Sequence, residues 1–216
     1  MSAPSVSPRE PTAGRTGEAR EAAQESKGWS VADPGPLGLA AFALTTFVLS
    51  MYNSGILDAK GEPVVFGLAL AYGGLAQLLA GMWEFRTGNT FGAVAFTSYG
   101  AFWLSFWAFV QFYAKDVPAS VAGQATGVYL VAWGVFTAYM FIASLRTTGA
   151  IATVFALLAI TFFLLGIGDW TTTSGITKAG GYVGLATALA AWYASFAAVT
   201  NSTFGRVVLP VMPLKR

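Results

Sequence analysis

The chain of 216 residues has a length that suits one or two soluble domains, but its composition excludes that class. Hydrophobic residues make up 55% of the sequence and charged residues only 10%, against about 25% charged residues in an ordinary globular domain. A net charge of +2 and the absence of Cys and His exclude a nucleic-acid-binding surface, disulfides and the usual transition-metal ligands. We therefore expect a protein of the lipid bilayer that is not an enzyme and uses no metal and no cofactor.

The first 32 residues are hydrophilic, with eight charged side chains between Arg9 and Lys27. Such a stretch cannot bury enough apolar surface to offset the entropy lost on ordering, so residues 1–32 are predicted to form a disordered tail. They also lack the apolar core of about 7 to 15 residues that a secretory signal peptide needs. The tail is therefore expected to stay attached, on the side of the membrane where the chain is made.

Residues 33–210 form one region in which six apolar segments alternate with short polar breaks. Each segment approaches the roughly 20 residues that a helix needs to cross the hydrocarbon core of a bilayer. None contains Asp, Glu, Lys or Arg, and they are predicted at residues 37–53, 63–83, 91–113, 124–145, 149–168 and 179–199. The predicted fold class is an all-α membrane protein with six transmembrane helices, followed by a short tail at residues 211–216.

Six crossings place both termini on one side of the membrane, and the basic residues indicate which side. Nine Lys and Arg residues lie on the terminal side, whereas only Lys60, Lys115 and Lys178 lie on the other. Because basic residues are enriched in cytoplasmic loops, both termini are predicted to be cytoplasmic.

Two further patterns concern packing in the membrane. Tryptophans in or beside the crossings are expected either to anchor helix ends at the interface or to add lipid-facing bulk. They are Trp83, Trp103, Trp107, Trp133, Trp170 and Trp192. Small residues at four-residue spacing, such as Gly180, Gly184 and Ala188, predict seams where two helices approach closely.

Polar side chains at membrane depth are the candidates for a transport path, because each needs a partner or a wet cavity. Most are Ser or Thr, whose hydroxyls can bond to their own helix. Gln77 differs, since an amide has four hydrogen-bonding sites that a helix backbone does not satisfy. It follows Gly73 and Gly74, which open space beside it. We expect Gln77 to face a pore or a polar cavity.

Ionisable side chains are missing from the middle of every predicted crossing. Glu84 and Asp169 come closest, at helix ends, and Glu84 is predicted to pair with Arg86 at the surface. A pump that relays protons keeps an acidic or His side chain within the membrane. The sequence therefore favours a passive pore, or a carrier whose substrate brings its own proton.

The run Asp33-Pro34-Gly35-Pro36-Leu37-Gly38-Leu39-Ala40-Ala41-Phe42 resembles the Asn-Pro-Ala-Pro-Leu-Gly-Leu-x-x-Phe signature of the acetate uptake transporter family, which includes a bacterial acetate/succinate transporter and fungal ammonia and acetate exporters. Asp33 stands where that signature has Asn, and Gly35 where it has Ala. Five further blocks match in order, at residues 72–77, 88–92, 95–100, 133–137 and 204–210. The resemblance covers the whole predicted membrane region.

The resemblance implies a plasma-membrane protein that passes small monocarboxylates, chiefly acetate, with succinate as a second candidate substrate, as a homo-oligomer that is hexameric in bacterial members. Each subunit is expected to hold its own central pore, narrowed by Phe42, Tyr99 and Leu158, with Thr45 and Gln77 along the substrate pathway. These three bulky residues lie eight, eight and nine residues beyond Pro34, Phe91 and Gly149, respectively. At 1.5 Å per residue, they are expected to meet about 12 to 14 Å into the membrane.

Three hypotheses about function follow. The first is an acetate channel or proton-coupled carrier, and the second keeps the fold but moves ammonia or another small neutral solute. The third is a non-transporting signalling or scaffold protein whose tail binds a partner. Uptake of labelled acetate separates the first from the third, and competition between acetate and the other solute separates the first from the second.

Overall fold

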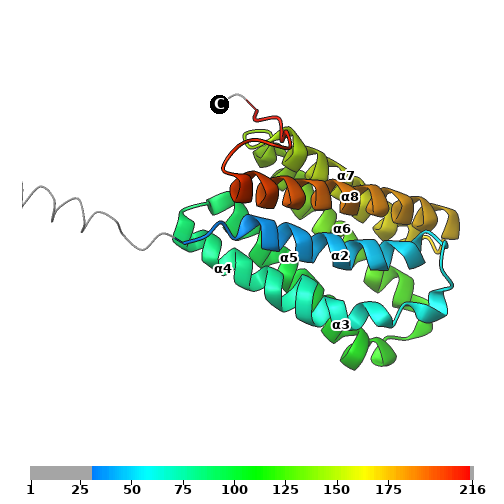
Figure 1. Cartoon of the computed structure of the whole chain (residues 1–216). Helices are drawn as coiled ribbons and strands as arrows, with labels where there is room; N and C mark the ends of the chain where they lie inside the picture. Colours follow the sequence, from blue (N-terminus) through cyan, green and yellow to red (C-terminus); the bar gives the residue numbers. More distant parts are fainter. Residues whose placement is uncertain (1–30, 215–216) are drawn as a thin grey trace, which may run out of the picture. The chain divides into compact units, whose positions relative to one another are not determined.

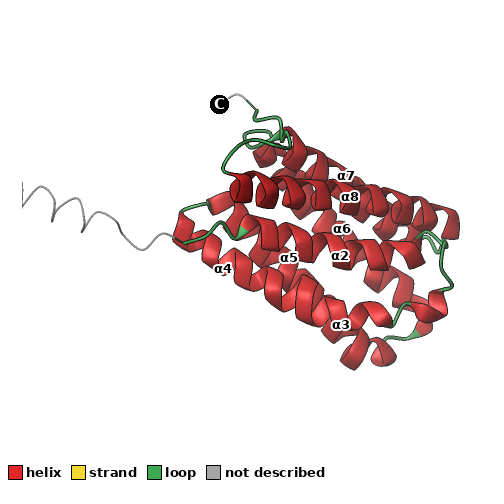
Figure 2. Cartoon of the chain, viewed as in Figure 1, coloured by secondary structure: helices red, strands yellow, loops and turns green. Residues whose placement is uncertain are grey.

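The computed structural model describes residues 31–214 of the chain. The chain divides into two units between Ala32 and Asp33, and all helices among the described residues belong to the second unit. The tail predicted at residues 1–32 lies almost entirely outside the described residues. Within the described part, the chain consists of helices and loops, as Figure 2 shows.

The second unit crosses back and forth six times, which confirms the predicted fold class (Figure 1). Its α-helices are α2 (Gly35–Asn53), α3 (Val64–Leu70), α4 (Gln77–Thr87), α5 (Thr90–Ala108), α6 (Ala119–Ser144), α7 (Gly149–Trp170) and α8 (Ser174–Phe204). A π-helical segment, Ala71–Ala76, joins α3 to α4, so that together they make the second crossing. The described residues thus contain six helical spans that are long and apolar enough to cross a membrane.

The helices extend beyond several of the predicted segments. The second crossing continues to Thr87 rather than residue 83, and α8 begins at Ser174 rather than residue 179. The added turns carry Arg86 and Lys178. The predicted segments stop before these residues because they were defined as runs without charged side chains. Long basic side chains can lie along an apolar surface while their charged ends reach water, so a helix can continue through them.

Helix α8 packs between α2 and α7, and small residues make the close approach possible. A Cβ atom placed on Gly181 would lie 2.2 Å from the backbone nitrogen of Ser54, so only glycine allows this contact between α8 and the end of α2. Ala188 is fully buried in the same helix. Of the predicted seam residues, Gly180 lies against Leu165 of α7 and Gly184 against Ser50 of α2. These contacts confirm the predicted seam, and they hold α8 against both neighbours.

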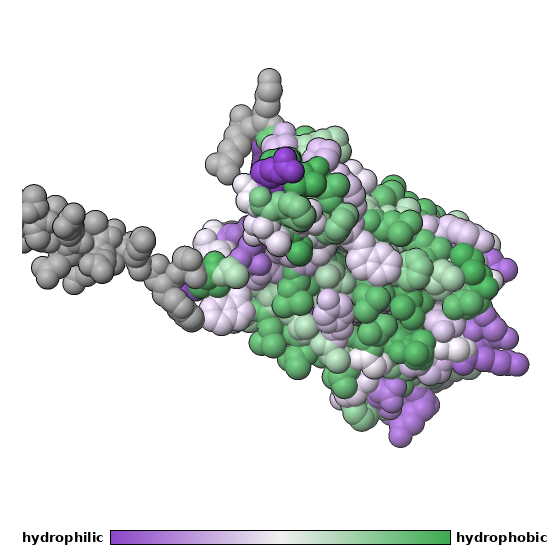
Figure 3. Space-filling model, viewed as in Figure 1, coloured by the Kyte–Doolittle hydropathy of each residue, from purple (hydrophilic) through white to green (hydrophobic). Residues whose placement is uncertain are grey.

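Large apolar side chains cover much of the outside of the unit. Figure 3 shows hydrophobic residues across the middle of the visible face and hydrophilic ones towards its ends. Trp83 and Trp170, near the ends of their helices, are about half exposed. Trp103 is instead only 2% exposed, so its predicted place at the membrane interface or against lipid is wrong.

Candidate functional site

Three cavities follow one another between α2, α5 and α7. The distal vestibule, of about 450 Å³, opens on the side away from the start of α2 and includes Glu62, Asp169 and Trp103 in its walls. The terminal vestibule, of about 360 Å³, lies beside Asp33 and Glu84. Between them is the waist, a cavity of about 20 Å³, which has room for about one water molecule.

The waist shares lining residues with both vestibules, so the three cavities form one interrupted path. Phe42 and Leu158 line both the waist and the distal vestibule. Leu39 and Phe155 line both the waist and the terminal vestibule. Closure at the waist comes from packed apolar side chains, and a passage of this kind is shut to water by dewetting.

The waist brings together Phe42, Tyr99 and Leu158, three residues from three different helices. They are 5%, 3% and 3% exposed, and the ring centroids of Phe42 and Tyr99 lie 5.9 Å apart. The helices α2, α5 and α7 run in the same direction, because they are the first, third and fifth crossings. All three side chains line one cavity, and their role as the constriction of a pore stays a prediction.

Tyr99 is held in place by a hydrogen bond to α6. Its hydroxyl lies 2.9 Å from Thr137 Oγ1, and Thr137 itself donates to the carbonyl of Trp133 at 2.7 Å. Since the single hydroxyl proton of Thr137 is used in that bond, Tyr99 must be the donor to Thr137. The phenol oxygen is thus occupied by α6, and Tyr99 contributes its ring to the closure of the waist.

The two polar residues expected along the path lie in different surroundings. Gln77 lines the waist, is 1% exposed, and its Oε1 atom has no hydrogen-bond partner. Thr45 is fully buried, and its hydroxyl donates to the carbonyl of Ala41 at 2.9 Å. Thr45 packs against Gly73 and is not among the residues lining the three cavities.

The residues that match the family signature build the start of α2. The Asp33 carboxylate accepts a hydrogen bond from the Gly35 N–H at 2.8 Å. Gly38 lies so close to the ring of Phe96 that a Cβ atom would come within 2.6 Å of it. Phe96 in turn lines the waist beside Leu39. Of the other signature residues, Pro34 and Pro36 begin the helix, and Leu37 is exposed on its outer side.

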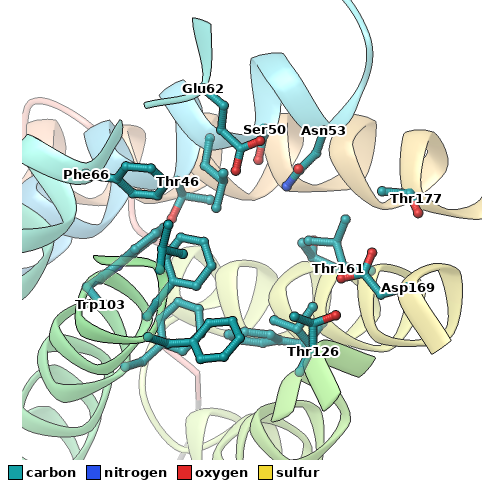
Figure 4. A pocket seen from close by; sticks show the side chains of 18 of the residues that line it. Thr46, Ser50, Asn53, Glu62, Phe66, Trp103, Thr126, Thr161, Asp169 and Thr177 are labelled. Atoms are coloured by element: carbon teal, nitrogen blue, oxygen red, sulfur yellow. The ribbon is translucent and has the colours of Figure 1, made fainter. Parts of the chain in front are cut away.

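Acidic side chains lie in the walls of the distal vestibule. Figure 4 shows that the carboxylates of Glu62 and Asp169 project from different walls into the same space. Burial raises the pKa of Glu62 above its ordinary value, and the nearby Asp169 carboxylate raises it further. Asp169 also lines an adjoining depression of about 580 Å³, and Lys178 is another of its lining residues. None of the described residues that line the waist or either vestibule is Lys or Arg.

Glu84 faces the terminal vestibule, and the predicted surface pair with Arg86 is not what holds it. Its side chain is 2% exposed and accepts a hydrogen bond from Thr87 Oγ1 at 3.0 Å. Arg86 is exposed, two positions further along the helix. Residues two apart in a helix point to different sides, so Glu84 turns inward while Arg86 turns out.

Helical spacing could have found these vestibule carboxylates from the sequence. Glu84 lies seven residues after Gln77, and Asp169 lies eleven after Leu158. Those spacings are close to two and three full turns, so each acid shares a helix face with a waist residue. Glu62 carries no such signal, because it lies in the loop before α3 and its position depends on how that loop folds back.

Comparison with known proteins adds an independent observation. The model of the GPR1/FUN34/yaaH family matches residues 16–216. The succinate-acetate/proton symporter SatP of Escherichia coli is 39% identical over 84% of this chain and 95% of its own length. A solved structure of the bacterial acetate channel SatP superposes with a TM-score of 0.79 at 38% identity, covering 84% of this chain and 99% of that one.

Fungal relatives are similar as well, and they are longer. Ammonia transport outward protein 2 of Saccharomyces cerevisiae is 44% identical over 79% of this chain and 62% of its own length. The present chain spans about two thirds of the length of the fungal relatives it matches.

Proposed function

The chain belongs to the GPR1/FUN34/yaaH family, and we propose that it transports small monocarboxylates, chiefly acetate, with succinate as a secondary substrate, along the path from one vestibule to the other. One observation carries the proposal. Two vestibules meet at a waist of about 20 Å³ that Phe42, Tyr99 and Leu158 close between them. A small solute that is partly apolar can pass such a constriction when the side chains move slightly, whereas large or strongly hydrated solutes are held back.

The chemistry of the waist suits acetate. Its methyl group can contact Phe42 and Leu158, while Gln77 offers a polar atom at the same level. Carboxylic acids have pKa values of about 4 to 5, so near neutral pH almost all of the substrate is anionic. Inward movement of that charge against an inside-negative potential costs about 2.3 kcal/mol per 100 mV. Uptake is therefore driven by the acetate gradient, by metabolic trapping, or by a proton that travels with the acid.

We propose further that the protein is a multi-pass protein of the plasma membrane, with both termini in the cytoplasm, and that it works as a homohexamer in which each subunit has its own path. The nine basic residues on the terminal side support the orientation. The hexamer rests on the resemblance to bacterial members of the family. A native-mass measurement in detergent is expected to find particles of six 22.6 kDa chains, and a purely monomeric protein would contradict this part of the proposal.

The direct test is uptake of labelled acetate into liposomes that contain the purified full-length chain. Uptake above that of empty liposomes is expected. A voltage imposed at constant pH speeds uptake when the anion crosses alone, and a pH gradient imposed at zero voltage speeds it when a proton crosses too. Uptake equal to that of empty liposomes under both conditions would contradict the proposal.

A second candidate is transport of ammonia, and the fungal relative named for outward ammonia transport favours it. A waist without charged side chains would also pass a small neutral molecule. Competition separates the two candidates. If acetate is the substrate, unlabelled acetate slows uptake of labelled acetate and ammonia does not, whereas the reverse pattern on ammonia flux would favour the second candidate.

A further inference from the structure

The last described residues of the chain fold back across the end of the helical bundle. Residues 205–214, here called the strap, leave α8 and run to the start of α7, as the red trace in Figure 1 shows. Thr148 and Pro213 form an antiparallel β-bridge, which joins the strap to the residue that caps α7. The ends of both helices line the terminal vestibule, so the strap lies across one side of its mouth.

Val211 is the strap residue that faces the terminal vestibule. It lines the cavity together with Ile151 and Phe155 of α7, and its side chain is partly buried against the apolar core. Among residues 205–214, no other residue lines this vestibule. Phe155 also lines the waist, so Val211 lies at the terminal end of the same path.

Two side chains of α8 fasten the root of the strap, which ends at Pro210. The Asn201 amide accepts hydrogen bonds from the N–H groups of Val208 and Leu209, at 2.7 and 2.9 Å, and donates one to the Leu209 carbonyl at 2.8 Å. The Tyr193 hydroxyl donates to the Pro210 carbonyl at 2.6 Å. These bonds hold the root on α8 whether or not the rest of the strap moves.

Backbone hydrogen bonds fasten the tip of the strap, residues 211–214, to the start of α7. They join the Gly149 N–H to the Met212 carbonyl at 2.7 Å, the Ala150 N–H to the Val211 carbonyl at 3.3 Å, and the Leu214 N–H to the Thr147 carbonyl at 3.1 Å. Met212 has a left-handed backbone conformation, with a φ of 52°, which is unfavourable for a residue with a side chain. None of the tip residues is fully buried. Because segments with few buried contacts open first, the tip is the part of the strap that detaches most readily.

We propose that the tip of the strap is a lid on the terminal vestibule, which swings away from α7 and carries Val211 out of the cavity when a solute passes. The proposal rests on the transport function proposed above and adds a second, movable closure at the terminal end of the path. When the tip opens, the bonds of Asn201 and Tyr193 keep the strap close to its closed position. Met212 can then return to an ordinary backbone conformation.

A disulfide across the tip tests the lid. Thr148 and Pro213 face each other as a non-hydrogen-bonded pair. In such a pair the Cα atoms lie about 4.5 Å apart, a separation that a disulfide can span. The natural chain has no Cys, so Thr148→Cys with Pro213→Cys places one thiol pair in an otherwise thiol-free protein. In liposomes, oxidation of this double variant is expected to lower acetate uptake about tenfold or more, and reduction is expected to restore it.

The two single variants are the matched controls. Thr148→Cys and Pro213→Cys alone cannot form the bridge within one chain, so the same oxidant is expected to change the uptake of each by less than about twofold. Recovery of uptake on reduction shows that the double variant is folded. If the natural protein transports acetate, equal uptake by the reduced variant and by the oxidised variant, with its disulfide confirmed by mass spectrometry, would overturn the lid and leave the transport function standing.

Hydrogen exchange tests the lid without any transport. In the natural protein in detergent, the amides of Gly149 and Ala150 are expected to exchange about tenfold faster or more than that of Ala152, which donates to Thr148 within α7. The disulfide is expected to slow the first two amides and leave Ala152 unchanged. Equal exchange of all three amides in the natural protein would overturn the lid, even if acetate is transported. Exchange that the disulfide slows, in a protein without uptake, would support the lid and contradict the transport function instead.

Discussion

Gln77 is buried at the narrowest point of the path with an amide oxygen that no other group satisfies. An amide in this position costs stability unless a passing solute or water bonds to it. We expect Gln77→Leu to raise the free energy of unfolding by about 1 kcal/mol and to slow acetate uptake about fivefold to tenfold. Thermal denaturation measures the change in stability, and uptake of labelled acetate into liposomes measures the change in transport rate.

Gln124→Leu on the exposed side of α6 is the matched control for this prediction. It is expected to leave uptake unchanged and to alter stability by less than about 0.5 kcal/mol. A Gln77→Leu protein that is both less stable and fully active would show that the amide is structural.

Glu62 gives the distal vestibule a charge that depends on pH. Its raised pKa, caused by burial and then by Asp169, means that it takes up a proton at a higher pH than an ordinary Glu does as the solution is acidified. Asp169 is the other charged residue that lines this cavity, and Lys178 lines the adjoining depression. Above its pKa, Glu62 is negative and repels an entering anion, and below it this repulsion disappears.

Glu62→Gln is therefore expected to raise acetate uptake about twofold to fivefold well above the raised pKa and to have no effect well below it. The ratio of variant to natural uptake, measured across pH, cancels the change in the fraction of protonated acetate. Asp116→Asn, an exposed acid outside the three cavities, should give a ratio of one throughout. A Glu62→Gln ratio that does not vary with pH would contradict the prediction.

The existence of each helix could be predicted from an apolar run in the sequence. The helix ends could not be predicted in this way, because the terminal turns carry charged residues, such as Arg86 and Lys178, whose side chains reach water from within a helix. The π-helical segment Ala71–Ala76 is also invisible to an apolar pattern, since its residues simply continue the apolar run of α3. This segment begins directly after α3 and delivers Gln77 to the waist.

The seam between α2 and α8 is a feature of whole elements and has its own test. Gly181→Ala would drive a methyl group into the backbone of Ser54, and we expect the variant to lose about 1 to 3 kcal/mol of stability. Gly175→Ala in the same helix has no atom within 4 Å of the new methyl group and is expected to be neutral or slightly stabilising. Thermal midpoints in one detergent compare the two, and equal midpoints would contradict the described packing.

At the scale of the whole molecule, the level of Phe42, Tyr99 and Leu158 follows from counting residues along parallel helices, whereas the walls of the vestibules do not. Counting from the helix starts gives depth alone, and direction needs the spacing from a residue already placed at the waist: Trp103 lies four residues after Tyr99 and turns inward with it. Counting could not place Glu62, which enters the distal vestibule from a loop. The position of Glu62 and the packing around Trp103 depend on which helices pair with one another over long sequence separations. A single sequence does not show that pairing.

The measurement that tests the central claim most directly is the effect of widening the waist on acetate flux. Leu158→Ala removes one side of the closure, and Ile160→Ala removes a similar side chain two residues away that is 48% exposed on the outside of α7. In liposomes, Leu158→Ala is expected to pass acetate faster than the natural protein and to admit larger carboxylates, with Ile160→Ala unchanged. Equal flux through all three proteins, at equal protein content, would contradict the claim that solutes cross at this waist.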